Sequence, residues 1–260
     1  STVANTIKDI LDYVPGVFAQ PKWGDDTRLS IRGSGLSRNF HLRSIQLYTD
    51  GIPMNTADGY GDFQEIDPTA YKYIEVYKGA NALQFGANSL GGAINFVTPT
   101  GRDPWPKGVS ADLGSFGFKR LQANVGGASG PWDGFVTAST QAADGFRNHS
   151  SGSSTRLSGN VGYQISPDAE TRFYFNAADV RQRIPGGVDK ITALTSPTTA
   201  APVNVLNDWQ RNIQTVRVAN KTAIHFEDTK VEFGAFGADR HLMQPSFQWL
   251  DYKYKDYCGF

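Results

Sequence analysis

The glycine-rich segments and the histidines are the residues to test first for chemistry. Gly33–Arg38, GSGLSR, begins like a dinucleotide fingerprint, but Arg38 stands where the third glycine belongs and no convincing helix follows. Ala87–Gly91, ANSLG, has alanine in place of the first glycine of a nucleophile elbow. The histidines lack the spacing of a zinc site; they are His41, His149, His225 and His241. Tight turns explain the glycine segments better, so we expect no enzyme, no resident metal and no cofactor.

A second set of residues could bind a ligand rather than transform it. Arginine and aromatic residues gather in two long segments between predicted strands: Phe146, Arg147 and His149 in one, and Arg181, Arg183, Trp209 and Arg211 in the other. Guanidinium groups pair with carboxylates and stack on aromatic rings, so these segments could hold an anionic or aromatic ligand. The same composition is also typical of the aromatic and basic girdle at a membrane surface.

The overall composition bounds the class of protein. The chain has 260 residues, enough for one large domain or two small ones, and 25 Lys and Arg balance 25 Asp and Glu. Because the net charge is zero and no basic stripe is visible, nucleic acid is not expected as a partner. The one cysteine, Cys258, is either a free thiol or, if the chain continues beyond Phe260, half of a disulfide. The 28 glycines and 12% aromatic residues favour a β-rich fold.

The sequence shows no sign of a membrane helix or of an export signal. No apolar run reaches the roughly 18 residues of a transmembrane helix. The start, STVANTIKDI, has neither the basic beginning nor the apolar centre of a signal peptide. These features fit a cytosolic protein or a processed or trimmed part of an exported one. A membrane β-barrel also lacks long apolar runs, so membrane residence stays compatible with the sequence.

The first part of the chain mixes helix and strand signals. Apolar residues recur at helical spacing over residues 7–14, and Pro15-Gly16 end that pattern. Short strands are expected in RLSIRG (28–33), IQLYTDGIPM (45–54), YKYIEVYKG (71–79) and GAINFVT (92–98), and helical turns in PTAYK (68–72) and NALQF (81–85). This mixture predicts a small α+β domain.

From Val109 onward, apolar residues alternate with polar or small ones. The apolar members are Val109, Ala111 and Leu113; Leu121, Ala123 and Val125; Leu157, Val161, Tyr163 and Ile165; Phe173, Phe175 and Ala177; Val216, Val218, Ile224 and Phe226; and Val231, Phe233 and Ala235. A period of two predicts strands with one apolar and one polar face. Several of these strands are about ten residues long, which suits a tilted membrane strand.

The connections between the predicted strands are alternately short and long after the first pair, as in up-and-down outer-membrane barrels. Alternation alone leaves open whether the apolar face points inward, as in lipocalin-type barrels, or outward to lipid.

The segment Ile74–Thr98, IEVYKGANALQFGANSLGGAINFVT, resembles the plug domain of TonB-dependent outer-membrane receptors of the ferric-siderophore type. The shared elements are Lys78-Gly79, Phe85-Gly86, Gly91-Gly92 and Asn95–Thr98, with further matches at Val14–Val17, Ile31–Gly33, Tyr48–Pro53 and Asp144–Arg147. Glycines suit such a crossing because the absence of a Cβ lets two backbones approach closely.

The resemblance implies a fold and a location. An α+β plug domain over residues 1–103 would be followed, over residues 104–260, by the N-terminal portion of an antiparallel transmembrane β-barrel with its apolar face toward lipid. The family barrel has 22 strands, whereas about seven are expected here, and a TonB box normally precedes the plug. Since an open sheet would leave unpaired edges in lipid, we expect a fragment of a longer receptor in the outer membrane of a Gram-negative bacterium.

The resemblance also implies a function. This is the TonB-dependent active transport of a ferric siderophore or ferric chelate, energised by TonB with ExbB and ExbD, by a monomer surrounded by outer-membrane lipid. Plug motifs are shared across substrates, so uptake of a non-iron nutrient such as cobalamin, nickel or a glycan is an alternative. A soluble all-β binding module is a further alternative.

The family's ligand contacts, carried over onto this sequence, predict binding residues at three plug apices. They are Arg32 with Arg38, Asn39 and His41 at the first apex, Thr56, Asp58 and Tyr60 at the second, and Phe85, where tyrosine is common, at the third. The barrel segments add Arg147, Arg183 and Trp209. For Arg32, the alternative is a buried ion pair between plug and barrel.

Overall fold

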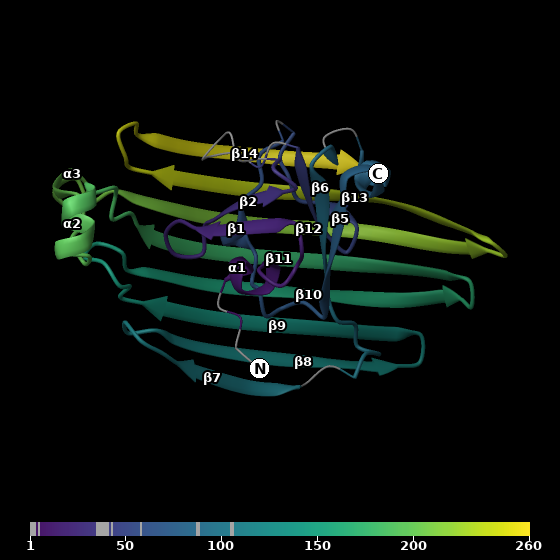
Figure 1. The fold of residues 1–260 in the computed structure, drawn as a ribbon. Coiled ribbons are helices and arrows are strands. Elements are labelled where there is room, and N and C mark those ends of the chain that lie inside the picture. Colours follow the sequence, from purple (N-terminus) through teal and green to yellow (C-terminus); the bar gives the residue numbers. More distant parts are fainter. Residues whose placement is uncertain are drawn as a thin grey trace. The chain divides into compact units, whose positions relative to one another are not determined.

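The computed structural model describes residues 4, 6–34, 42, 44–57, 59–86, 89–104 and 107–260. The chain forms two compact units, residues 1–99 and residues 100–260 (Figure 1). The described elements of the first unit are helices and short strands up to β6, and those of the second are β7–β14 with two short helices. The expected order, an α+β domain followed by antiparallel strands, is confirmed.

The first unit contains a four-stranded mixed sheet and a separate two-stranded sheet. The strands of the larger sheet are β3 (Ile45–Thr49), β4 (Ile52–Pro53), β5 (Tyr73–Lys78) and β6 (Gly92–Val97), in the order β4-β3-β6-β5. β3 and β6 run parallel, and the other neighbours run antiparallel. β1 (Val17–Pro21) pairs with β2 (Thr27–Ile31), α1 spans Ile7–Leu11, and 3-10 helices η1 and η2 span Phe63–Glu65 and Gly79–Phe85.

Most of the expected short elements are present, with two differences. The helical turn expected at residues 68–72 is wrong, because the Asp67 side chain accepts hydrogen bonds from the Thr69 amide and hydroxyl. This local bonding offers the backbone an alternative to a helix. Strand β1 was not predicted, since its five residues, VFAQP, show no clear alternation and end in proline.

One apolar cluster joins the helix and both sheets of this unit. Its most buried members come from α1 (Ile7, Leu11), β2 (Leu29, Ile31), β3 (Ile45, Leu47), β6 (Ile94, Phe96) and the turns after β4 (Phe63, Ile66). Side chains of this size contribute about 1.5–3 kcal/mol each when fully buried, so this cluster is the main stabilising feature of the unit.

The paired glycines at the start of β6 lie where the backbone is crowded. A Cβ built on Gly92 would lie 2.6 Å from the Tyr77 carbonyl oxygen, and one on Gly91 would lie 2.6 Å from the Ser34 Cβ. Real Cβ atoms do not approach other atoms so closely, so any side chain here would push the strands apart. The expectation that glycine permits this close crossing is confirmed.

The Asp50-Gly51 pair forms the turn between β3 and β4. Both residues have positive φ, 54° and 79°, as a type I′ hairpin turn requires. The Asp50 carboxylate accepts hydrogen bonds from the Thr98 amide and hydroxyl at 2.9 and 2.8 Å, and the Gly51 amide donates to the Asn95 side chain at 2.9 Å. The turn is therefore fastened to the end of β6, which explains the aspartate and glycine of the YTDGIP motif.

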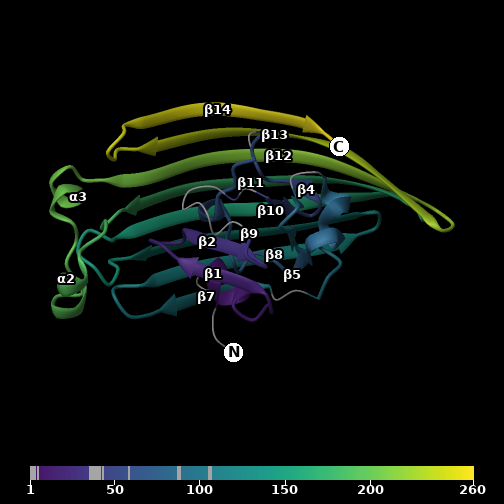
Figure 2. The same ribbon diagram turned by 45° about the horizontal axis from the view of Figure 1, so that its top comes forward.

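The second unit is one antiparallel sheet of eight strands in sequence order. They are β7 (Gly108–Leu113), β8 (Lys119–Ser129), β9 (Trp132–Ala143), β10 (Gly152–Ser166), β11 (Ala169–Arg183), β12 (Gln210–Phe226), β13 (Thr229–Gln244) and β14 (Leu250–Gly259). Figure 2 shows the long strands curving side by side. About seven strands were expected. The additional one is β14, LDYKYKDYCG, where tyrosines and charges replace the apolar alternation.

The connection between β11 and β12 holds two short helices. They are α2 (Lys190–Thr195) and α3 (Pro202–Leu206), and both lie at the left end of the sheet in Figure 1. Asp189 caps α2, because its carboxylate accepts hydrogen bonds from the Thr192 amide and hydroxyl. No helix in the described part of the chain is both long and apolar enough to cross a membrane.

The two faces of the eight-stranded sheet differ in polarity and in exposure. On β12, Val216 and Val218 are 56% and 57% exposed, whereas Thr215 and Arg217, which alternate with them, are each 7% exposed. The positions of this exposed face from Val216 to Phe226, apolar except for Asn220 and Thr222, span ten residue steps, about 34 Å along a strand and about 26 Å at a typical tilt of ~40°. The exposed face is therefore the apolar one, and its height matches the lipid-facing band of outer-membrane barrels.

Polar and aromatic residues flank the two ends of this apolar band. Trp132 and Tyr163 stack with ring centroids 4.6 Å apart beside the short turns. At the other end, Thr155, Asp179, Gln214, His241 and Lys253 are paired in succession across β10–β14. This arrangement is typical of strands whose ends reach the two interfaces of a bilayer.

A buried ion cluster fixes the segment that precedes β7. The Arg172 guanidinium donates to both carboxylate oxygens of Asp133 at 2.8 and 2.9 Å and to Glu170 at 2.8 Å. The Gly101 amide donates to Asp133 at 3.1 Å, and a Cβ on Gly101 would lie 2.0 Å from the Gly127 carbonyl oxygen. The segment is thus held against β8 and β9 by a glycine contact and by charge.

Replacing Gly92 by alanine should destabilise the first unit. The added methyl group cannot fit beside the Tyr77 carbonyl oxygen, and overpacking of this kind costs about 1–3 kcal/mol. Thermal unfolding of the purified protein in detergent should show a lower midpoint. The matched control is Gly187→Ala, whose Cβ meets nothing within 4 Å. Equal midpoints for the two variants would contradict the crowding argument.

Replacing Asp133 by asparagine should destabilise the second unit strongly. It leaves the buried Arg172 without its bidentate carboxylate, and breaking a buried pair on one side typically costs about 3–5 kcal/mol. The control, Asp239→Asn, removes an exposed partner 3.6 Å from Lys255 and should cost at most about 1 kcal/mol. Denaturant titration measures both; a small effect at Asp133 would show that the cluster does not hold the segment.

Candidate ligand-binding residues

The predicted ligand contacts divide into those that the structure describes and those that it does not. Arg38, Asn39, His41 and Asp58 lie outside the described residues. The remaining candidates are Arg32, Thr56, Tyr60 and Phe85 in the first unit, and Arg147, Arg183 and Trp209 in the second.

Arg32 directly follows β2 and is exposed. Its φ is 50°, an unfavourable left-handed conformation for a residue with a side chain, and its amide donates to the Gly16 carbonyl at 2.9 Å. Hypothetical Cβ atoms on Gly79 and Gly16 would lie 3.5 and 3.8 Å from its side chain. Lys78 donates to the neighbouring Pro15 carbonyl, so two cations flank this turn. The arrangement suits recognition of an anionic group, because a guanidinium is always charged.

Thr56 and Tyr60 close a tight turn. The Thr56 amide and hydroxyl both donate to the Tyr60 carbonyl, at 2.8 and 3.1 Å, and the Tyr60 hydroxyl donates to Asp62 at 3.1 Å. Asn55 fixes the base of the turn, since its side chain bonds the backbone of Leu47, Ile45 and Gly59. The described residues on the two sides of this turn are therefore tied to each other and to β3.

Phe85, at the end of η2, is half-buried among aromatic rings. Its centroid lies 4.6 Å from that of Tyr48 and 4.7 Å from that of Tyr77, and its carbonyl accepts the Tyr48 hydroxyl at 2.5 Å. Burial raises the pKa of Tyr48, so this phenol stays a neutral donor at ordinary pH. Phe85 itself offers a ligand only ring surface, as its sequence identity predicts.

Arg147, in the β9–β10 connection, supports a neighbouring loop. Its guanidinium donates to the Thr199 carbonyl at 2.7 and 3.1 Å and to the Gly186 carbonyl at 2.7 Å. Both carbonyls belong to the β11–β12 connection, which carries α2 and α3. The side chain thus fixes the position of that connection.

Arg183 and Trp209 lie at the two ends of the same β11–β12 connection. The Arg183 guanidinium pairs with Asp208 at 3.1 Å. The Trp209 carbonyl accepts the Ile184 amide at 2.9 Å and lies 3.2 Å from the His149 ring, which is 3.7 Å from Asp208. The structure therefore brings Arg147, Arg183 and Trp209 into one loop cluster.

Sequence reasoning missed Asp208 as the partner of this cluster. The residue is an ordinary acid in a long connection, and strand register brings it near His149, which is 59 positions earlier in the chain. Asp189, in the same connection, is held ionised because its hydrogen bonds with Thr192 lower its pKa. The loop cluster therefore contains both signs of charge.

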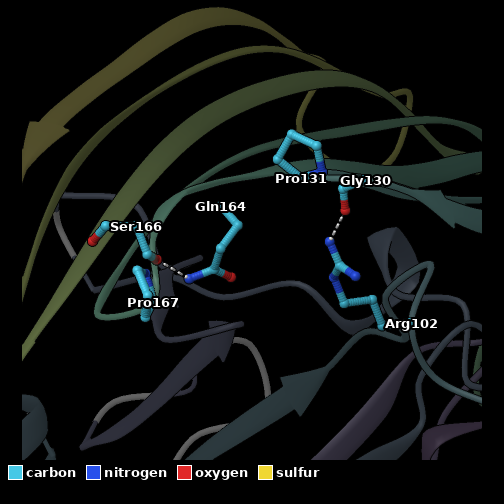
Figure 3. Close-up of a pocket in the computed structure, with 6 residues that line it drawn as sticks. All are labelled: Arg102, Gly130, Pro131, Gln164, Ser166 and Pro167. Carbon is cyan, nitrogen blue, oxygen red and sulfur yellow. Dashed lines mark hydrogen bonds between the residues drawn. The ribbon is translucent and has the colours of Figure 1, made fainter.

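A pocket lies at the opposite end of the sheet, among the short turns. It is lined by Arg102, Gly130, Pro131, Gln164, Ser166 and Pro167 (Figure 3). Arg102 donates to the Gly130 carbonyl at 2.8 Å, and Gln164 donates to the Ser166 carbonyl at 2.7 Å. Both polar side chains point to backbone groups of the pocket wall, so the pocket offers few free groups to a ligand.

Metal-ligating side chains do not cluster in the described part of the chain. Within it, no group of three or more His, Cys, Asp or Glu residues is placed to hold a metal ion. The candidate residues above carry cations, hydroxyl groups and aromatic rings.

Comparisons with known proteins agree with this architecture. Residues 1–93 match the family described as TonB-dependent Receptor Plug Domain. The vitamin B12 transporter BtuB of Photobacterium profundum is 30% identical over 147 residues, which cover 55% of this chain and 23% of that protein. The rhizobactin receptor of Rhizobium meliloti is 29% identical over 174 residues, which cover 57% and 23%.

A solved structure shares the fold of both units. The ferric citrate transporter FecA in its unliganded form superposes with a TM-score of 0.75 at 17% identity, covering 93% of this chain and 38% of that one. The chain spans about a quarter of the length of the two sequence relatives. Residues 1–93 are thus a TonB-dependent receptor plug domain, and the antiparallel strands that follow it resemble those of the receptor barrel in fold.

Proposed function

We propose that the protein carries out TonB-dependent active transport of a ferric siderophore or ferric chelate across the outer membrane. The observation that carries the proposal is a plug domain joined in one chain to strands whose apolar face matches a bilayer. Two proteins similar to this chain are a rhizobactin receptor and a ferric citrate transporter. The proposal requires no covalent chemistry, since binding and release suffice for transport.

The ligand would first meet the loop cluster and the plug residues predicted from the sequence. Arg32 supplies a permanent positive charge, Phe85 an aromatic surface, and the Thr56–Tyr60 turn a preformed edge. Of the residues that the structure describes, these are the ones we assign to ligand contact, together with Arg147, Arg183 and Trp209.

Release would depend on an external energy source. TonB, working with ExbB and ExbD, would favour a plug state with lower affinity for the ligand. A partner can shift an equilibrium only by its differential affinity for the two states, so TonB must bind one plug state better than the other. We further propose that the receptor acts as a monomer in outer-membrane lipid.

Cobalamin uptake is the second candidate function. It rests on the 30% identity with the vitamin B12 transporter BtuB. A ferric chelate and cobalamin differ in size, charge and chemistry, so one transport assay separates them.

In a Gram-negative host lacking its own receptors, the complete protein should support uptake of a radio-iron chelate only when TonB is functional. The panel should include ferric citrate, hydroxamate and catecholate chelates, and radiolabelled cyanocobalamin. Uptake of cobalamin alone would overturn the iron assignment and leave TonB-dependent transport standing. Failure to take up any of them, with normal amounts in the outer membrane, would overturn the transport proposal as a whole.

Arg32→Asn should reduce uptake of the transported ligand about tenfold. Hydrogen bonds to a charged group contribute about 1.5–3 kcal/mol, and asparagine tolerates the left-handed backbone at this position. Arg32→Lys keeps the charge and should retain more activity. Binding assays on whole cells, normalised to receptor amount, measure the effect. If both variants bind like the unaltered protein, Arg32 has no part in ligand recognition.

A further inference from the structure

The segment that joins the two units is fastened at both of its ends. In the first unit, the amide and hydroxyl of Thr98, the residue after β6, donate to the Asp50 carboxylate at 2.9 and 2.8 Å. In the second unit, the Gly101 amide donates to the Asp133 carboxylate at 3.1 Å. The residues between these two attachments are Pro99 and Thr100. The chain therefore passes from one unit to the other with very little slack.

The attachment in the second unit is buried and built from several groups. Gly101 is buried, and a Cβ placed on it would overlap the Gly127 carbonyl oxygen, so its backbone lies directly against β8. Asp133 is also buried, and Arg172 donates to both of its carboxylate oxygens at 2.8 and 2.9 Å. The Arg172 guanidinium donates in addition to the Asn160 side chain at 2.7 Å. Bidentate pairing fixes the orientation of the carboxylate, which keeps one oxygen directed at the Gly101 amide.

Two neighbouring residues extend this attachment. Arg102 donates to the Gly130 carbonyl, in the turn between β8 and β9, at 2.8 Å (Figure 3). Its Nε lies 3.5 Å from the Asp133 carboxylate. The Asp103 carboxylate accepts hydrogen bonds from the Thr100 amide and hydroxyl at 2.9 and 3.0 Å, which closes this piece of chain on itself. Residues 100–103, with Asp133 and Arg172, are called the linker clamp below.

The linker clamp limits how far the end of the first unit can travel while the chain stays intact. With the clamp closed, Thr98 is three residues from the fixed Gly101, and an extended chain spans at most about 10 Å over that distance. With the clamp open, the next residue that the structure describes as paired in a strand is Gly108, ten residues from Thr98. The limit then rises to about 35 Å, which exceeds the roughly 30 Å thickness of the hydrocarbon core of a bilayer.

A change of plug state would load this clamp. If TonB displaces parts of the first unit, any displacement that reaches Thr98 passes along the chain to Gly101. The clamp resists it because opening would leave the buried Arg172 guanidinium beside a carboxylate that has lost part of its surroundings, and buried charge tolerates such loss poorly. The strands beneath the clamp, β8 and β9, are paired along their whole length, so the clamp rests on a firm support.

We propose that the linker clamp is a stop that limits the displacement of the first unit during transport, so that a chelate is admitted while larger solutes stay excluded. Asp133 acts here as a positioning residue. It is not assigned to ligand contact, and it acts by holding Gly101, through which movement of the first unit is restrained. The inference rests on the proposed TonB-dependent transport and adds a limit to the movement that transport requires.

The first test measures entry of vancomycin, a large hydrophilic antibiotic, into cells that carry the complete receptor. With functional TonB, and with each chelate of the uptake panel supplied in turn, Asp133→Asn should raise entry at least about tenfold, because breaking a buried pair shifts an equilibrium by more than that factor. Without TonB, entry should equal that of the unaltered receptor. The matched control is Asp239→Asn, at an exposed ion pair, which should leave entry unchanged.

A spacer tests the length argument without altering the ion cluster. Eight glycine and serine residues inserted between Pro99 and Thr100 add up to about 27 Å of chain and should cause the same TonB-dependent entry. The same insertion between Glu227 and Asp228, in the exposed β12–β13 turn, is the control and should have no effect. Immunoblots measure the amounts in the outer membrane. If Asp133→Asn does not reach the membrane, the spacer variant decides the test.

Two results would overturn the inference while transport stands. Vancomycin entry that rises equally with and without TonB would show that the clamp only stabilises the fold. Unchanged entry in the variants, at normal amounts in the outer membrane, would show that the clamp does not limit the displacement. Radio-iron uptake by the unaltered receptor is measured in the same cells. If that uptake does not depend on TonB, the proposed function is wrong, and the assignment of the clamp falls with it.

Discussion

The constraint on which the second unit depends is that each strand must satisfy two different surroundings at once. Exposed side chains on one face are mostly apolar, and the other face buries polar and charged side chains beside apolar ones, as Val216 and Arg217 show at adjacent positions. A shift of register by one residue would exchange every side chain between these surroundings. The antiparallel pairing is therefore specified along the full length of strands such as β12, whose neighbours β11 and β13 are bonded over most of its residues.

The same constraint determines where charge is found. A charge on the apolar face is costly at the middle of a bilayer but not at its borders. Accordingly, Asp179, Arg181 and His241 lie beyond the apolar band and Asp239 lies in its first row, paired with Val216, whereas Arg156, Arg217 and Arg240 lie on the polar face. The Asp133–Arg172 pair shows that buried charge on this face can be fully paired, with both carboxylate oxygens engaged.

The first unit is held together in a different way, because its apolar core is small. Glycines let strands approach until backbone atoms meet, as at Gly92 and the Tyr77 carbonyl, and polar turns are fastened by side chains, as Asp50 is to Thr98. These features explain why the plug motif is so specific in sequence. Each of its glycines and acids answers a local geometric requirement, and few other residues meet it.

The sequence predicted what depends on local chemistry and missed what depends on distant contacts. Alternation gave most of the long strands, and the plug motif gave the α+β unit, but β14 escaped because tyrosines and charges occupy its positions. The role of Arg147 could not be predicted, since its partners are carbonyl groups of Gly186 and Thr199, and a carbonyl carries no sequence signal. The pairing of Arg183 with Asp208 depends likewise on how the long connection folds back.

The loop cluster and the polar face of the sheet are held by separate sets of contacts. The loop cluster is held by contacts among its own residues, as the bonds from Arg147 and Arg183 show, so its shape can change with little effect on the sheet. The charge of the polar face is built into strands whose register is specified from end to end, so it can change only residue by residue. Substitutions in the loop cluster and on the polar face should therefore have additive effects on stability, because the two sets of residues share none of the contacts named above.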